Sequence, residues 1–166
     1  MLEPIEGGGP TPAPTPGAPL ALAGVVWSTV ELDRAEDELE PWLSAADPAL
    51  GDGDAPADRH LGARARRRRS AALPGRVLLL EEPSTEGRLA ASLARDGEGP
   101  CALLLSATAG LAAWTADARR RGVAVSARRR GPLGPAVLVP GRVVAGPHLV
   151  IVEAVATGSR PSTIDP

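Results

Sequence analysis

Few side chains in this 166-residue chain could take part in chemistry. Glu81 follows the apolar run Val77–Leu80, so its carboxylate stands at the end of a predicted strand. A buried carboxylate there would have a raised pKa and could act as a general base, whereas an exposed one would pair with an arginine. His148 begins another predicted strand, where it is either a solvated imidazole or a catalytic or ligand-binding group. Glu81 and His148 are therefore the candidate catalytic residues.

The single cysteine, Cys101, excludes a disulfide framework and any all-cysteine metal site. It has no clear histidine partner in the sequence, which favours a buried structural thiol over a nucleophile. His60 lies in a predicted loop, while His148 and Glu153 are five residues apart on one predicted strand and so face opposite ways. Because a catalytic metal needs three or four protein ligands, we expect no metal and no cofactor.

The charges are unevenly distributed along the chain. Residues 31–58 carry ten acids and one arginine, whereas residues 59–69 carry six arginines and no acid. We expect the two stretches to neutralise each other across a surface; the alternative is that Arg66–Arg69 binds a phosphate or a CoA-like anion. A formal net charge of −2 and a pI near 5.7 exclude nucleic-acid binding through overall charge.

The ends of the chain differ from its middle. Residues 1–19 form a Pro/Gly-rich segment that we expect to be a disordered tail, and residues 156–166 form a polar C-terminal tail. No apolar run approaches the ~18 residues of a membrane span. The first residues lack the basic and apolar regions of a secretory signal. We therefore expect a cytoplasmic protein with one folded domain at 20–155 and no membrane partner.

Hydrophobic periodicity predicts two similar halves. The first half has a strand at 23–30, a helix from Leu32 to about residue 46, a poorly marked second strand and a strand at 76–81. A helix at 84–96, with Ser84 as its cap, joins the halves. The second half has a strand at 101–106, a helix beginning at Leu111 and strands at 123–126, 135–139 and 148–153. This order predicts an α+β fold of two βαβββ modules, about 20–83 and 100–155, with two curved sheets facing each other.

Three segments resemble the vicinal oxygen chelate superfamily, which includes glyoxalases, bleomycin-resistance proteins, extradiol dioxygenases and methylmalonyl-CoA epimerases. Residues 25–35 (VVWSTVELDRA) are similar to the opening strand and "DLDRA" helix start of the family. Residues 78–83 (LLLEEP) and 93–99 (LARDGEG) resemble a connection in the epimerase-like branch, and residues 116–123 (ADARRRGV) precede the closing strands. The resemblance spans about residues 20–155 and implies paired βαβββ modules.

The resemblance also implies positions for a divalent metal, which the family holds with His and Glu residues on the inward faces of four strands. At these positions the sequence has Gly24, Leu79, Ala102 and Val150, none of which can coordinate a metal. A member of the family with this sequence is therefore expected to work without a metal.

The resemblance further implies a cup between the sheets that binds a small organic molecule. Because the side chains of each strand alternate between its two faces, the inward-facing ones would line this cup. They are Glu81, His148 and a set of ligand-binding candidates: Val26, Trp27, Ser28, Ala102, Leu104, Val150 and Val152. Trp27 either lines the cup or packs beneath a helix, while Trp42 and Trp114 are expected in the core. Three functions remain open: a metal-independent binding protein of the bleomycin-resistance type, a metal-free isomerase, cyclase or lyase acting by proton transfer, or a degenerate dimerisation or interaction module. A homodimer is allowed but not required.

Overall fold

The computed structural model describes residues 19–84 and 86–154. The predicted C-terminal tail, and all but the last residue of the predicted N-terminal tail, lie outside the described residues. Within them, none of the helices is both long enough and apolar enough to cross a membrane.

The strands and helices follow the predicted duplicated order. They are β1 (Leu20–Ser28), α1 (Leu32–Leu39), β2 (Gly53–Asp58), β3 (Ala63–Arg69), β4 (Val77–Pro83), α2 (Arg88–Asp96), β5 (Gly99–Ala107), α3 (Leu111–Arg120), β6 (Arg129–Gly131), β7 (Gly134–Val139), α4 (Gly141–Val144) and β8 (His148–Glu153), with short 3-10 helices at Glu40–Trp42 and Pro48–Leu50. Each half is therefore a βαβββ module, and α2 joins the halves. The predicted α+β fold class is confirmed.

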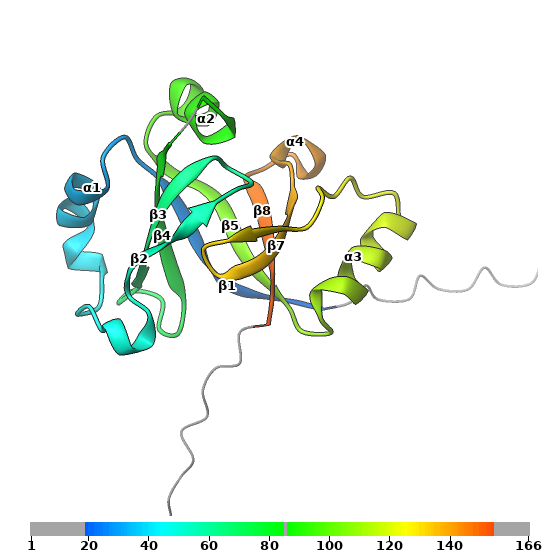
Figure 1. The fold of residues 1–166 in the computed structure, drawn as a ribbon, viewed down its shortest axis with the longest axis horizontal. Coiled ribbons are helices and arrows are strands. Elements are labelled where there is room, and N and C mark those ends of the chain that lie inside the picture. Colours follow the sequence, from blue (N-terminus) through cyan, green and yellow to red (C-terminus); the bar gives the residue numbers. More distant parts are fainter. Residues whose placement is uncertain (1–18, 85, 155–166) are drawn as a thin grey trace, which may run out of the picture.

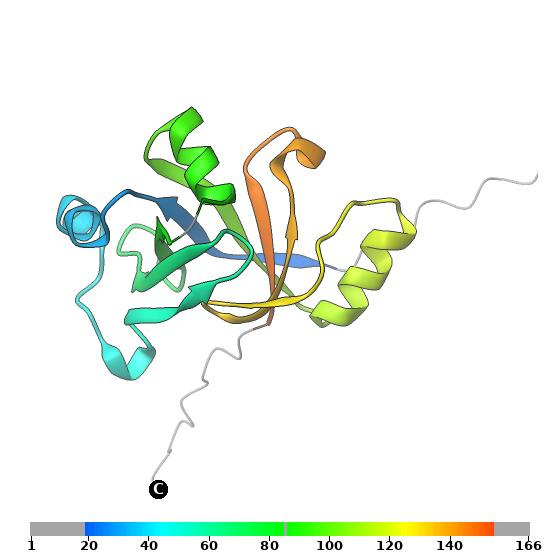
Figure 2. The ribbon, with the colours of Figure 1, turned by 45° about the horizontal axis from the view of Figure 1, so that its top comes forward.

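The two modules share one sheet rather than forming two separate ones. Its strand order is β2-β3-β4-β1-β5-β8-β7-β6. In each module the first strand pairs in parallel with the last, and β1 pairs with β5 antiparallel across the boundary. The sheet curls until its edge strands β2 and β6 come into contact, and Figures 1 and 2 show the two halves facing each other. The predicted facing sheets are thus two halves of one sheet.

Alternating side chains give the sheet two apolar faces. The concave face carries one buried cluster: Val26, Leu61, Ala63, Leu79, Leu89, Ala102, Leu104, Ala136, Leu138, Val150 and Val152. A second cluster, Ala107, Leu111, Val137, Val139 and Ile151, lies where α3 packs on the convex face, with half-buried Trp114 against it. Successive residues of β7 and β8 alternate between the clusters, as the period of two in a strand requires.

The helix after β1 is shorter than predicted. It ends at Leu39, and the 3-10 turn that follows has Pro41 in its first turn. Leu43 is already extended and forms a bridge with Ser70. This change of direction turns Trp42 outward, where its exposed fraction is 61%. The prediction that Trp42 is a core residue is therefore wrong.

Two other local predictions are also corrected. Residues 123–126 are not a strand. In a strand pair the Leu138 N–H would donate to a backbone carbonyl of this segment, but it donates to the Ser126 hydroxyl instead (2.8 Å). The third module strand is instead β6, a few residues later. Ser84 does not cap α2, which begins at Arg88 after Gly87; its hydroxyl donates to the Gly62 carbonyl (3.1 Å).

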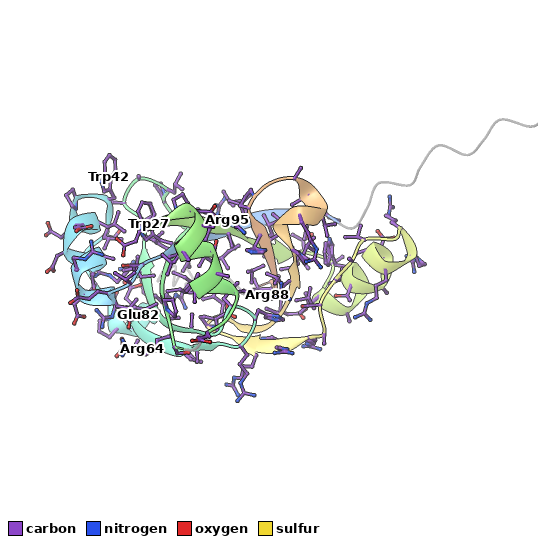
Figure 3. The ribbon with its side chains drawn as sticks, turned by 90° about the horizontal axis from the view of Figure 1, so that it is seen from above. Trp27, Trp42, Arg64, Glu82, Arg88 and Arg95 are labelled. Carbon is purple, nitrogen blue, oxygen red and sulfur yellow. The ribbon has the colours of Figure 1, made fainter. Side chains whose placement is uncertain are left out.

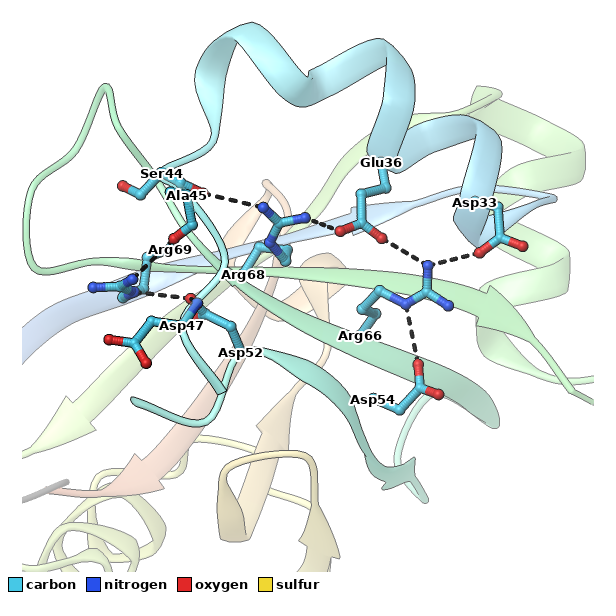
Figure 4. Close-up of polar contacts among 10 residues, drawn as sticks. All are labelled: Asp33, Glu36, Ser44, Ala45, Asp47, Asp52, Asp54, Arg66, Arg68 and Arg69. Atoms are coloured by element: carbon cyan, nitrogen blue, oxygen red, sulfur yellow. Dashed lines mark hydrogen bonds and ion pairs between the residues drawn. The ribbon is translucent and has the colours of Figure 1, made fainter. Parts of the chain in front are cut away.

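The acidic and basic stretches neutralise each other, as expected. Arg66 on β3 pairs with Asp33 (2.7 Å) and Glu36 (2.7 Å) of α1, and with Asp54 (3.0 Å) of β2. Arg68 also pairs with Glu36 and donates to the Ser44 carbonyl (3.1 Å), and Arg69 pairs with Asp52 (3.0 Å). Figure 4 shows these arginines between α1 and β2. Three of the four arginines in Arg66–Arg69 therefore hold α1 and the following loop against the sheet.

Candidate functional site

A pocket lies at one end of the curled sheet. Its volume is about 830 Å³, and it opens between α2, the first residues of β5 and the segment from α4 to the start of β8. In Figures 1 and 2, α2 and α4 stand on the same side of the sheet. Ser28 and Ala102 form part of its floor, so the pocket reaches the concave face of the sheet at its upper edge.

One wall of the pocket is a single face of α2. Arg88, Ser92 and Arg95 all line it, and their spacing of four and three residues places them on one side of a helix. Figure 3 shows Arg88 and Arg95 on the side of α2 that faces α4. The neighbouring helix face carries Leu89, which packs into the concave cluster. Burial of Leu89 therefore fixes the direction in which the arginines point.

The opposite wall contains His148. Its Nδ1 accepts a hydrogen bond from the Gly141 N–H (3.0 Å), so the neutral ring carries its proton on Nε2. Burial lowers the pKa of His148, and the positive charges of Arg88 and Arg95 lower it further. With Nδ1 accepting from Gly141, the neutral ring has Nε2–H free to act as a hydrogen-bond donor.

Glu81 is fully buried on the concave face, beside Ser28 in the register of β1 and β4. Within the described residues, no hydrogen-bond donor reaches either of its carboxylate oxygens. Burial raises the pKa of Glu81 well above its ordinary value, and the nearby carboxylate of Asp58 raises it further. Two carboxyl groups can bond to each other only when one of them holds a proton.

Asp58, unlike Glu81, has hydrogen-bond donors of its own. Asp58 Oδ1 accepts from the backbone N–H groups of His60 (2.6 Å) and Leu61 (3.0 Å) at the β2–β3 turn. The small side chains of Ala63 and Ala65, buried on the adjacent strand, leave room for the two carboxyls to meet. The raised pKa of Glu81 means that its protonated form persists to higher pH than that of an exposed carboxyl group.

Cys101 lines the pocket and is half-buried. Burial raises the pKa of its thiol to about 12, with a further contribution from Glu81. The thiolate is the nucleophilic form of cysteine, so this thiol is a poor nucleophile at neutral pH. The geometry agrees with the predicted structural thiol.

The predicted ligand-binding residues divide into two groups. Ser28 and Ala102 line the pocket. Val26, Leu104, Val150 and Val152 are at most 2% exposed and pack into the concave cluster, where Leu61 and Leu89 lie among them. Trp27 is half-buried and is not part of the pocket lining. The interior of the cup is thus largely filled by side chains, and open space remains at its end.

The positions that a metal would require in this fold do not fit one. Leu79, Ala102 and Val150 are buried apolar residues of the concave cluster. At Gly24 a Cβ atom would lie 2.0 Å from the Val77 carbonyl oxygen, so this backbone leaves no room for a ligand side chain. Among the described residues, no three His, Cys, Asp or Glu side chains come close enough to hold a metal ion.

The remaining candidates have structural contacts. His60 is buried, with Nε2 3.0 Å from the Ala136 carbonyl and Nδ1 3.3 Å from the Ser126 hydroxyl, and so links the two modules. Glu153 is exposed, and its Oε1 accepts from the Leu111 N–H (3.2 Å) at the start of α3.

Sequence reasoning missed the arginines of the pocket, Arg88, Arg95 and Arg142, and the partner of Glu81, Asp58. The spacing of Arg88, Ser92 and Arg95 on a predicted helix was an available signal for one wall. Nothing in the sequence indicated that Arg142 would lie across from them, or that Asp58 would reach Glu81.

The curled sheet of two βαβββ modules is the fold of the vicinal oxygen chelate superfamily, and the resemblance seen in the sequence is confirmed at the level of fold. Methylmalonyl-CoA epimerase from Mycobacterium tuberculosis superposes with a TM-score of 0.68 at 20% identity, over 81% of this chain and 87% of the other. The Streptomyces coelicolor methylmalonyl-CoA epimerase in complex with 2-nitronate-propionyl-CoA gives 0.64 at 20% identity, over 83% and 96%.

A hypothetical protein, BH1468 from Bacillus halodurans C-125, has the same fold, with a TM-score of 0.63 at 14% identity over 84% of this chain and 97% of the other. No protein-family model matches the sequence, and no curated protein matches it significantly. At these identities the similarity defines the fold, and the function must be argued from the pocket.

Proposed function

We propose that this protein binds a small organic molecule, without a metal, in the pocket between α2 and the α4–β8 segment. The observation that carries the proposal is the pocket itself. Its volume of about 830 Å³ is within the range of small-molecule sites, roughly 300–1,000 Å³. Apolar residues and a few polar groups line it together, and the polar groups come from separate elements that the sheet holds in place.

Metal independence is supported by the residues on the concave face. The close approach of Gly24 to Val77 and the apolar packing of Leu79, Ala102 and Val150 leave no ligand set at the expected positions. The chain's own polar groups must then hold the ligand.

The test is to block the pocket with a side chain that the backbone tolerates. Gly146 lines the pocket, has no positive φ, and a Cβ there would meet only the Val144 carbonyl oxygen at 3.8 Å. Gly146→Trp should therefore fill the pocket without strain. Ala113→Trp, which adds the same side chain to the exposed surface of α3, is the matched control.

Binding is measured by ligand-detected NMR with a set of small neutral and charged organic compounds. We expect compounds to bind the wild type and Ala113→Trp, and to lose binding in Gly146→Trp. If no compound binds, or if binding survives in Gly146→Trp, the proposed function is wrong and an interaction module becomes the better description of this domain.

A second candidate function, proton-transfer catalysis, is favoured by the Glu81–Asp58 pair. Glu81 neighbours Ser28, and Ser28 reaches the pocket floor. A ligand incubated with the protein in D₂O would gain deuterium at an acidic C–H position if the protein transfers protons. Loss of this exchange in Glu81→Gln, with ligand binding retained, would identify an enzyme, whereas recovery of unlabelled ligand from the wild type supports a binding protein.

A further inference from the structure

The charged groups of the pocket do not balance. Five of its lining residues are charged: Arg88, Arg95, Asp96, Glu98 and Arg142. Both acids are already neutralised. Arg95 holds Asp96 with two hydrogen bonds of 2.8 and 2.7 Å, and Arg34, from outside the pocket, holds Glu98 with two of 2.6 and 2.7 Å.

Arg88 and Arg142 have no such partners. Neither makes a hydrogen bond or an ion pair with any residue in 19–84 or 86–154. The surplus in the pocket is therefore two positive charges, one on each side of the opening. This contrasts with the run Arg66–Arg69, where three guanidinium groups are bound by carboxylates. A concave site that concentrates charge of one sign attracts ligands of the opposite sign.

The position of Arg88 is also unfavourable for the helix that carries it. Arg88 is the first residue of α2; no side chain caps this helix, and its first turn contains no acid. The N-terminus of a helix carries a partial positive charge, so an arginine there reduces helix stability and an anion beside it would restore it. Helix stability therefore does not explain Arg88, and an anion bound beside it would offset its cost to the helix.

His148 experiences the same positive field. Its Nδ1 accepts from Gly141, which leaves Nε2–H as a neutral donor on the wall opposite α2. A neutral donor in the same pocket as these arginines suits an oxyanion, because it adds a hydrogen bond without adding a charge that must be desolvated.

We infer that the pocket recognises an oxyanion on its ligand, a phosphate or a carboxylate, held by Arg88 from α2 and Arg142 from α4, with Arg95 and His148 beside it. The inference rests on the proposed function and specifies the chemical class of the ligand. Arginine suits this task because its planar guanidinium group matches both phosphate and carboxylate.

Nucleic acid, which also carries phosphate groups, fits this protein less well than a small oxyanion does. No tryptophan lines the pocket and the chain contains no phenylalanine or tyrosine, so bases would have nothing to stack on. The net charge of the chain is also negative, which opposes binding along an extended backbone. A small anion can be held by two arginines inside a pocket, whereas a polymer would also extend over the rest of a chain whose net charge is negative.

The test uses inorganic phosphate and malonate as probes, with ionic strength held constant by sodium chloride. The chain has only two histidines, so the ring signals of His148 are readily identified by proton NMR through their loss in His148→Asn. A bound anion offsets the charges of Arg88 and Arg95 and raises the pKa of His148, and the size of this rise against probe concentration gives an affinity.

We expect at least one probe to bind the wild type, with the tighter of the two identifying phosphate or carboxylate as the preferred group. Arg88→Ala and Arg142→Ala should each weaken binding by about three- to tenfold, since each removes one charged contact. Arg119→Ala, an exposed arginine of α3 away from the pocket, should leave it unchanged.

Two results would overturn the inference. Either neither anion shifts His148, or binding is the same in Arg88→Ala and Arg142→Ala as in the wild type. Neutral compounds that bind the wild type but not Gly146→Trp, in the absence of any anion effect, would refute the oxyanion class while leaving the proposed function intact.

Discussion

The protonated state of Glu81 makes a quantitative prediction about stability and pH. In the folded protein its pKa is raised well above the ordinary value of about 4.5. Stabilisation from the protonated group is fully present below pH 4.5 and is lost as pH rises toward the folded-state pKa, because the unfolded chain then releases a proton that the folded chain keeps. One proton gives a slope of at most about 1.4 kcal/mol of unfolding free energy per pH unit.

Glu81→Gln removes this titration while keeping the shape of the side chain. Its amide N–H can still donate to Asp58, whose Oδ1 accepts from the backbone N–H groups of His60 and Leu61. The variant should therefore match the wild type near pH 4.5 and become the more stable of the two as pH rises. The difference in free energy of unfolding should grow by up to about 1.4 kcal/mol per pH unit.

The assay is urea unfolding of both proteins at half-unit steps between pH 4.5 and pH 8, followed by tryptophan fluorescence. The difference between the two curves isolates Glu81, because all other titrating groups are common to both. Glu86→Gln makes the same change at an exposed position and should run parallel to the wild type. Parallel curves for wild type and Glu81→Gln would refute the assignment of the proton to Glu81.

Three further predictions concern the pocket and the strand that opens the fold. Gly24→Ala should lower the free energy of unfolding by about 2–3 kcal/mol, because its Cβ would lie 2.0 Å from the Val77 carbonyl oxygen; a loss below about 0.5 kcal/mol in urea unfolding would contradict this close approach. His148 should titrate below 6.5 in a proton NMR experiment, and Arg88→Ala should raise its pKa only part of the way back, because burial is the larger cause; no change would place Arg88 away from the ring. Iodoacetamide should alkylate Cys101 at pH 8 more than tenfold slower in the folded protein than in urea, since the thiol has a pKa of about 12; equal rates would mean that the thiol is exposed.

The sequence predicted most of the regular structure. The strand at 148–153 was placed with its observed bounds, and the strands at 76–81, 101–106 and 135–139 overlap β4, β5 and β7. These segments are apolar runs bounded by glycine or proline, which is the strongest local signal for a strand. The second strand of the first half was expected but poorly marked, because the sequence GDAPAD of β2 has neither apolar alternation nor β-branched residues. It is a strand because β3 supplies its backbone partners and Arg66 binds its Asp54.

The wrong predictions for Trp42 and for residues 123–126 share one cause. Local periodicity does not show where the chain leaves a regular helix or strand. Trp42 continues the helical spacing of Leu32 and Ala35, but Pro41 and the bridge from Leu43 to Ser70 end the helix first. The predicted strand at 123–126 has a composition typical of strands, but the Leu138 N–H donates to the Ser126 hydroxyl rather than to a backbone carbonyl of the segment.

By itself the sequence determined the two-module α+β plan, the neutralisation of the acidic stretch by the arginine run, and the presence of apolar residues where the fold would require metal ligands. The first two follow from residue types and short-range periodicity, which are properties of the chain, and the third follows from the resemblance to the vicinal oxygen chelate superfamily together with the residue types at those positions. Tertiary structure decided the site. Arg88 and Arg142 lie 54 residues apart, and Asp58 and Glu81 lie 23 apart, so no local pattern relates them. Arg88 and Arg142 line one pocket because the sheet curls and α2 buries Leu89, which directs one face of that helix toward α4.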